Sequence, residues 1–416
     1  MFVKGQEMKK IVITGSSTYG VNNMGDDSML ACMVQGVRRH WDNPEIVFIC
    51  RHPNEQYDQA FGFTSVKNID HDSREESIGR FFLGMNEGDS TAHLAEIKNQ
   101  IETADLLLIG GNSFMEICKN EFLRGVSTYA ATLGTLAKFC ETPFGLYGLN
   151  VVDDIRDPTT KEHAKFLISN AIHTTVRETK TLEYLSDIGI ESSKISVCGD
   201  PAYGMEYDQR INPHSVLEKC GISIDYNRPL VGVALRQEYW TGEEADFHAK
   251  TNHVARVLDR FSLDCDVDLL LIPNCTYTAA HLWQDDRVAH RKLFELMSEK
   301  NRVKLVEEQL SVFETYSLFS LLDFHISNRR HSCIFAAMNL VPFLSLSGSL
   351  AGHMSPFLLD LSLPRQIADM TDEKDFSAKM LHTWEDRKNI KNILLEKIPE
   401  LQAVARTNIS RILDSF

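Results

Sequence analysis

Two arginines and a histidine gather in one short segment of this sequence, residues 327–332 (SNRRHS). An apolar run before it predicts a buried strand (322–326), and an apolar run after it predicts a buried helix. Arg329, Arg330 and His331 would then lie at the carboxyl end of a parallel strand, beside the free N–H groups of a helix N-terminus. This pattern predicts an anion site with a proton donor. The alternative is that the arginines are solvated and that His331 only caps the helix.

Glycine and polar residues follow several other predicted strands. Paired glycines would let a ligand approach the backbone, although a tight turn explains them too. Asp26 would also suit a helix dipole, and Arg177 could be a helix-flanking salt-bridge residue. The candidate residues are Asn23, Gly25 and Asp26 after the strand 11–15, Gly110, Gly111 and Asn112 after 105–109, Arg177 after 172–176, and Arg236 after 230–235.

The composition narrows the class of protein. The 416 residues are 43% hydrophobic and 24% charged, which is typical of a soluble globular chain. A net charge of −15 argues against nucleic acid as a partner and against broad adhesion to an anionic membrane. Nine scattered cysteines without a CxxC pair suggest neither a disulfide framework nor a zinc site. With no apolar leader and no run of membrane-spanning length, we expect a cytoplasmic protein, with the inner face of the membrane left open.

Two complete halves of alternating strands and helices organise the chain. This alternation predicts two doubly wound, Rossmann-like α/β domains facing a cleft, similar to the glycosyltransferase B class. The expected domains are residues 1–207 and 214–375, followed by C-terminal helices (376–416), broken at Pro399, that pack back on the first domain. The first glycine-rich turn does not fit G-x-G-x-x-G, so nicotinamide binding is weakly supported. Asp264, Asp266 and Asp268 look like a metal-binding DxD motif but favour a turn leading into a strand.

Seven motifs in order resemble the polysaccharide pyruvyl transferase family. Each motif alone is weak, whereas the series is fairly specific and runs over most of the chain. The R-H-x-x-I-F-A-A-x-x-x-V-P-F block at 330–343 is the most extensive of them. The others are N-x-G-D at 23–26, G-G-N-x-F at 110–114, V-R-E-x-x-T-x-x-Y-L-x-x-x-G at 176–189, G-D-P-A-Y at 199–203, V-G-V-A-L-R at 231–236, and Ile272-Pro273 with Asp285-Asp286.

The resemblance implies transfer of an enolpyruvyl-derived group from phosphoenolpyruvate to two hydroxyls of a sugar, with a ketal formed and phosphate released. Arg177 and Arg330 would hold the carboxylate and phosphate of this donor, with Arg329, Arg236, Asn23, Gly25, Asp26, Gly110, Gly111 and Asn112 nearby. His331 would be the general acid that protonates the methylene carbon. The scheme requires neither a metal nor a cofactor besides the donor. The acceptor is a sugar or glycan, with a lipid or nucleotide carrier and an oligomeric state left open.

One departure from the family pattern concerns the donor. The family usually has a tyrosine and then a lysine after the V-P-F strand, whereas no lysine occurs here from Leu305 to Glu373, and His353 is the nearby cationic candidate. Two alternatives therefore stay open. One is another transferase on this scaffold with a nucleotide-sugar donor, and the other is a non-catalytic member of a glycan-assembly complex.

Overall fold

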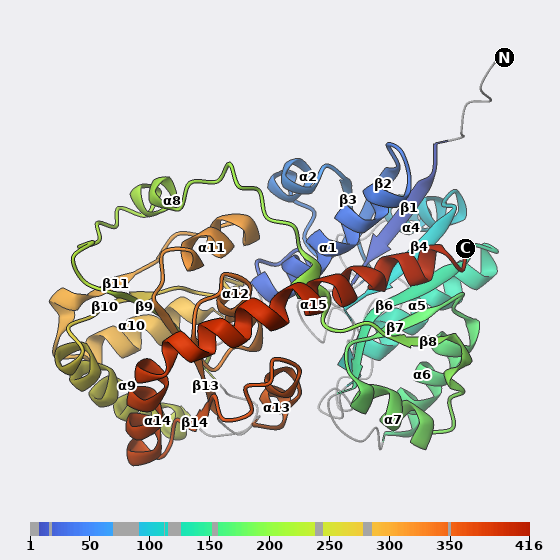
Figure 1. Ribbon diagram of the computed structural model, residues 1–416. Helices are drawn as coiled ribbons and strands as arrows, with labels where there is room; N and C mark the ends of the chain where they lie inside the picture. The colour runs from blue at the N-terminus through green and yellow to red at the C-terminus, as the bar shows by residue number, and fades with distance from the viewer. Residues whose placement is uncertain are drawn as a thin grey trace. The chain divides into compact units, whose positions relative to one another are not determined.

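The chain forms two compact units, each built on one parallel β-sheet (Figure 1). This computed structural model describes residues 8–15, 19–69, 91–111, 113–114, 126–151, 157–237, 244–277, 285–347 and 351–416. The first unit holds the described residues up to Val21, together with Asp26–Glu206 and Gln402–Phe416. The second unit holds Asn22–Gly25 and Tyr207–Leu401. The fold class predicted from the strand–helix alternation is confirmed.

The first unit carries a parallel sheet with strand order β3-β2-β1-β4-β6-β7-β8, and a short β5 pairs with β6. Its strands read as continuous apolar runs, because helices cover both faces of a parallel sheet. The strands are β1 (Lys10–Thr14), β2 (Glu45–Cys50), β3 (Thr64–Lys67), β4 (Leu106–Gly110), β5 (Ser113–Phe114), β6 (Phe144–Val151), β7 (Thr174–Val176) and β8 (Ile195–Val197). The helices are α1 (Met24–His40), α2 (Glu55–Phe61), α4 (Thr91–Glu102), α5 (Val126–Phe139), α6 (Pro158–Asn170) and α7 (Thr179–Asp187), with 3-10 turns η2 (Ser192–Lys194) and η3 (Pro201–Gly204).

The second unit repeats this plan with the strand order β11-β10-β9-β12-β13-β14. Its core joins inward residues of β9, β10 and β12 to one face of α9 and α14. The strands are β9 (Leu230–Ala234), β10 (Asp268–Leu271), β11 (Val303–Leu305), β12 (Phe324–Ser327), β13 (Phe343–Ser347) and β14 (Ile367–Asp369). The helices are α8 (Pro213–Lys219), α9 (Glu244–Asp264), α10 (Asp286–Leu296), α11 (Val312–Phe319), α12 (Arg330–Met338), α13 (Ala351–Asp360), α14 (Glu373–Glu385) and α15 (Arg387–Leu413), and η5 (Lys300–Arg302) precedes β11.

Two helix boundaries differ from the sequence prediction. The predicted break at Pro399 is wrong, because α15 continues through it and the helical tail is interrupted instead at Asp386. The missing N–H of Pro399 leaves the carbonyl of Leu395 without its helical partner, and Leu395 is 50% exposed, so water can replace that bond. At the other end of the chain, the apolar spacing predicts a helix over residues 28–37, whereas α1 begins at Met24. Gly25 and Asp26 therefore belong to the first turn of a helix.

The C-terminal residues are shared between the units. Helix α14 packs against β14 and α9 of the second unit. Beyond Leu401 the chain belongs to the first unit, where Ile409 lies over Gly36, Ile412 lies over Gly145, and the Asn408 side chain donates to the carbonyl of Cys198.

The predicted turn leading into a strand is confirmed for Asp266 and Asp268, whereas Asp264 is the last residue of α9. Asp268 begins β10 and forms an ion pair with Arg228 at 3.3 Å, and Asp266 lies in the preceding turn. Among the described residues, no group of three or more histidine, cysteine or acidic side chains is arranged to hold a metal ion. In the same part of the chain, no helix combines the length and apolarity needed to cross a membrane.

Candidate functional site in the second unit

The predicted cationic turn lies where the central strands of the second sheet end. Strand β9 lies between β10 and β12, so the segments that follow these three strands are neighbours. Asn328 fixes one pair of ends: its side-chain oxygen accepts from the backbone N–H of Arg236 at 2.7 Å, and its amide donates to the Arg236 carbonyl at 2.9 Å. Ser327 donates to the carbonyl of Ala234 and accepts from the backbone N–H of Arg329, both at 2.8 Å. The ends of β9 and β12 are thereby locked together.

Asp286 ties the segment after β12 to the segment after β10. Its carboxylate is fully buried and pairs with Arg329 through both Nε, at 3.2 Å, and Nη2. One carboxylate oxygen also accepts from the backbone N–H groups of Asn274, at 2.9 Å, and Cys275, at 3.0 Å. A buried carboxylate needs this number of donors to offset its lost hydration. The Arg329 guanidinium, which was predicted to bind the donor, is thus paired with a carboxylate of the protein. The Asp286–Arg329 pair supports the segments that surround the candidate site.

Residues Asn22–Gly25 complete this edge of the second unit. Asn23 forms an antiparallel bridge with Cys275, the Met24 N–H donates to the Asn274 carbonyl at 2.8 Å, and the Thr276 N–H donates to the Asn22 carbonyl at 3.0 Å. Asn23 and Gly25 of the N-x-G-D motif are therefore part of the candidate site around the second sheet.

His331 packs directly on Gly25. A Cβ placed on Gly25 would lie 2.2 Å from Nδ1 of His331, which is far inside van der Waals contact. Gly25 does not have a positive φ, so the glycine is needed here for space. The imidazole consequently rests against the first turn of α1, in the part of that turn that belongs to the second unit.

Two contacts orient the start of α12, which carries His331. The Ser332 hydroxyl lies 2.7 Å from Nε2 of His325, a fully buried histidine on β12. Burial lowers the pKa of His325 to about 3, so this imidazole is neutral and acts as a fixed hydrogen-bonding group. The guanidinium of Arg330 lies over the buried ring of Phe357 on α13, 5.9 Å from its centroid. Arg330 is thereby positioned by a cation–π contact.

Three further polar residues at this edge are buried, and sequence reasoning missed them as site residues. His290 on α10 accepts from the backbone N–H of Leu235 at 3.0 Å, and burial lowers its pKa to about 4. Its Nδ1, the Asn274 side-chain oxygen and the Thr276 hydroxyl have no hydrogen-bond partner in the part of the chain that the structure describes. Buried polar atoms in folded proteins are nearly always satisfied by protein, water or ligand. Water, a ligand or further protein groups must therefore satisfy these three atoms.

The first unit holds the other predicted residues. Arg177 follows β7 and is 6% exposed, and its Nε donates to the carbonyl of Gly148 at 2.8 Å. Its Nη1 lies 3.6 Å from the buried carboxylate of Asp200, and its Nη2 lies 3.5 Å from the Gly111 carbonyl. Arg177 is thus at a strand end, as predicted, and its guanidinium contacts protein acceptors there.

Tyr19 gives the predicted glycine pair a structural reason. A Cβ on Gly111, which has a φ of 63°, would lie 2.2 Å from the Tyr19 hydroxyl, and one on Gly110 would lie 2.2 Å from the Met33 methyl group. Gly15 makes room for the same ring. The Tyr19 side chain is buried, and its burial raises the pKa of the phenol well above the usual value. These glycines therefore leave room for side chains of the protein, Tyr19 and Met33.

The structure places the remaining predicted residues as follows. Asp26 lies on the first turn of α1 and belongs by its contacts to the first unit. Arg236 enters the second-unit site through its backbone. Asn112 lies outside the described residues, and so does the side chain of His353, which is on α13. The structure thus brings Asn23, Gly25, Arg236, Arg329, Arg330 and His331 to one edge of the second unit.

Comparison with solved structures defines the class of fold. The UDP-GlcNAc 2-epimerase from Neisseria meningitidis, solved with UDP-GlcNAc, has a TM-score of 0.62 and 12% identity over 98% of this chain and all of that one. The UDP-GlcNAc 2-epimerase from Methanocaldococcus jannaschii has a TM-score of 0.60 and 11% identity over 91% and 92% of the two chains. Anabaena HepE in complex with UDP-glucose has a TM-score of 0.58 and 11% identity over 98% of each. At this identity the likeness establishes a GT-B-like fold.

The family follows from the sequence itself. The family model described as polysaccharide pyruvyl transferase matches residues 23–349, which is well over half of the chain. The protein therefore belongs to the polysaccharide pyruvyl transferase family. A search of curated proteins finds no match.

Proposed function

We propose that this protein transfers a pyruvate-derived group from phosphoenolpyruvate to two hydroxyls of a sugar in a glycan. The observation that carries the proposal is the position of His331. It stands at the carboxyl ends of the central strands, on Gly25, next to Arg330 and within a frame fixed by the Asp286–Arg329 pair. Membership of the family supports the class of reaction.

The proposed chemistry gives each group a defined part. His331 donates a proton to the methylene carbon of the donor, and the first sugar hydroxyl adds to the neighbouring carbon and returns its proton to the imidazole. The second hydroxyl then displaces phosphate from the same carbon, which closes the ketal, and its proton leaves with the phosphate. Arg330 offers a cation to the donor's anionic groups. Two new C–O bonds and one C–H bond form as the C–OP bond and the double bond are lost.

The partners of this reaction belong to the proposal. They are phosphoenolpyruvate and a sugar or glycan acceptor, carried on a lipid or a nucleotide, and the reaction would take place in the cytoplasm or at the inner face of the membrane. Arg177 would hold a donor anion if the first unit takes part, and its present partners Gly148 and Asp200 would then be rearranged.

A direct assay tests the proposal. The purified protein is incubated with phosphoenolpyruvate and candidate glycan acceptors, and phosphate release is measured together with the mass of the acceptor. The expected result is phosphate release coupled to acceptor pyruvylation. His331→Gln should lower turnover by about 10²–10⁴-fold, because an amide can cap a helix but cannot deliver a proton.

A matched control separates the loss of a proton donor from nonspecific damage. His382→Gln alters an exposed histidine on α14 in the same unit and should leave turnover unchanged. Near-normal turnover in His331→Gln would remove the acid from the mechanism. Calorimetric binding of UDP-GlcNAc in place of phosphoenolpyruvate would instead support a nucleotide-sugar donor, and binding of neither would support a non-catalytic role.

A further inference from the structure

A cavity opens at the amino ends of strands of the second sheet, at the opposite ends of those strands from His331. It has a volume of about 250 Å³, and its lining includes residues from the segments just before β12 and just before β13. In a parallel sheet these amino ends face away from the carboxyl ends that carry the candidate site. Strand β12 has four residues, which separates the two edges by about 13 Å. The cavity is therefore distinct from the site around His331.

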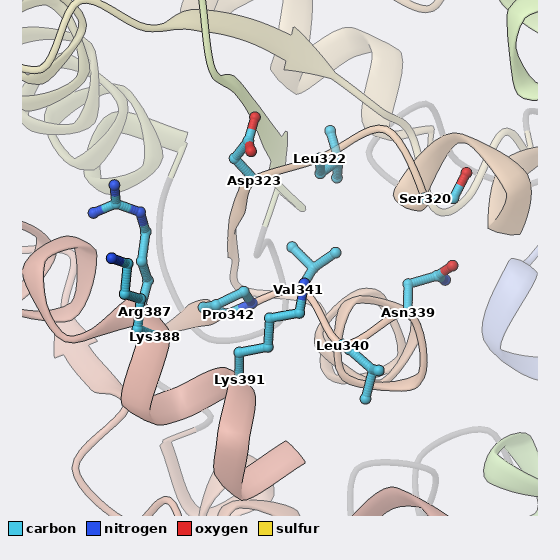
Figure 2. Close-up of a pocket in the computed structure, with 10 residues that line it drawn as sticks. All are labelled: Ser320, Leu322, Asp323, Asn339, Leu340, Val341, Pro342, Arg387, Lys388 and Lys391. Carbon is cyan, nitrogen blue, oxygen red and sulfur yellow. The ribbon is translucent and has the colours of Figure 1, made fainter. Parts of the chain in front are cut away.

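One wall of the cavity is cationic. Figure 2 shows the side chains of Arg387, Lys388 and Lys391, which come from the start of α15 and line the cavity. Leu340, Val341 and Pro342 line it from the segment that leads into β13. Arg387 is fixed in place, because its Nη1 donates to the Trp384 carbonyl at 2.6 Å and its guanidinium lies 4.0 Å from the centroid of that ring. Lys388 and Lys391 form no ion pair or hydrogen bond with the residues that the structure describes.

The position of these cations on α15 is electrostatically unfavourable when no anion lies between them. They occupy the beginning of a helix, where the macrodipole is positive and acidic side chains are preferred, and the first turn of α15 has no acidic residue. Lys391 also stands three and four residues from Lys388 and Arg387, a spacing at which like charges repel. This arrangement becomes favourable when an anion occupies the space between the cations.

The acidic side chain in the lining does not cancel this charge. Asp323 is the carboxylate in the wall, and it accepts from the backbone N–H of Leu230 at 2.9 Å. Three cations against one engaged carboxylate leave the cavity positive on a chain whose net charge is −15. A local field of this sign selects an anion against the repulsion of the whole protein.

The size of the cavity narrows the class of ligand. Pockets that enclose drug-sized molecules usually measure about 300–1,000 Å³. A cavity of about 250 Å³ suits a group smaller than a nucleotide sugar. Arginine and lysine side chains together are the usual protein ligands of phosphate.

We propose that this cavity, defined by Asp323, Leu340–Pro342, Arg387, Lys388 and Lys391, binds a phosphate group, as a free phosphate ester or as an anionic lipid headgroup. This site is independent of the proposed pyruvyl transfer, since it shares no residue with the edge that carries His331.

The experiment compares binding by the whole protein and by a double variant. Calorimetric titration with pyrophosphate tests a free ligand, and co-sedimentation with phosphatidylglycerol vesicles against phosphatidylcholine vesicles tests a headgroup. Lys388→Gln with Lys391→Gln should weaken whichever binding is seen by about tenfold or more, since each charged hydrogen bond contributes that order of affinity. The same variant should raise the melting temperature of the ligand-free protein, because it removes the repulsion at the start of α15. A variant that failed to fold would lower it.

Two controls make the result decisive. Lys397→Gln changes a lysine on the same helix that pairs with Glu400 at 3.5 Å, outside the cavity, and should bind as the unchanged protein does. Arg330→Gln alters the opposite edge of the sheet and should also leave this binding in place. The proposal is overturned if neither probe binds, if the double variant binds as tightly as the unchanged protein, or if Arg330→Gln abolishes the binding instead.

Discussion

Replacing Asp286 by asparagine tests whether this carboxylate holds the second-unit site together. The side chain is fully buried, receives two backbone N–H groups and pairs with Arg329, whose side chain is 12% exposed. The amide can still accept from the backbone, so the change removes mainly the partner of a nearly buried cation. Removing one partner of a buried ion pair destabilises a protein by about 3–5 kcal/mol. We expect Asp286→Asn to lower the free energy of unfolding of the second unit by that amount.

The double variant Asp286→Asn with Arg329→Gln separates the charge from the geometry. It removes the uncompensated cation, so most of the lost stability should return. Turnover should stay low if Arg329 and Asp286 position the segments around His331. Denaturant unfolding measures the first effect, and the pyruvylation assay measures the second.

Hydrogen exchange locates the damage. Backbone amides of Asn274, Cys275 and Thr276 should exchange faster in Asp286→Asn, because a neutral amide oxygen accepts more weakly than a carboxylate from the first two, and the third belongs to the adjoining bridge. A loss of stability below about 1 kcal/mol with unchanged exchange at these amides would refute the reasoning, since it would place the pair among the weak surface interactions.

The remaining predictions concern one glycine and one buried acid. Gly25→Ala should lower turnover by about 10²-fold while the fold is kept, because the added methyl group would displace the half-buried His331 ring by more than an ångström. Steady-state kinetics measure the turnover, and a thermal melt shows whether the fold is kept. Burial raises the pKa of Asp27 from 3.8 to about 8, so between these values the folded protein holds a proton that the unfolded chain has released. Stability should therefore fall as pH rises from about 4 to 8, and Asp27→Asn, which keeps a partner for Tyr57, should flatten that fall in melts across this range. An equally steep pH dependence in Asp27→Asn would show that another group causes it.

Much of the fold could be predicted because its strands are buried on both faces. β4 is an apolar strand between Asp105 and Gly111, and β10 lies in a mostly apolar run that ends at Pro273, which is the pattern of a central parallel strand. The boundaries of α1 and α15 could not be predicted in the same way. Met24 begins α1 where its N–H is bound by the distant Asn274 carbonyl, and no local signal marks that contact. Pro399 is a local signal that the helix overrides.

The cationic residues of the candidate site could be predicted from the sequence, whereas the buried residues that hold them in place could not. The residue types of Arg330 and His331, and their position directly after a predicted strand, indicated them as site residues. Asp286 stood in the sequence as part of one motif of the resemblance and as an acid at the start of a helix, and nothing there assigned it a role; its neighbour Asp285 caps α10. Its pairing with Arg329 and its bonds to the segment after β10 depend on how three strand ends come together. His290 likewise reads as an ordinary helical residue.

The place of Asn22–Gly25 in the second unit has a consequence for how this protein is made. These residues leave the ribosome long before the partner segment Asn274–Thr276 exists, a delay of roughly ten to fifty seconds at ordinary rates of synthesis. The site around His331 can close only late, when the nascent chain has returned to its own beginning. A fragment that starts at Tyr207 would contain the whole second sheet and still lack Gly25 under the histidine, so cutting the chain at that point removes part of the candidate site.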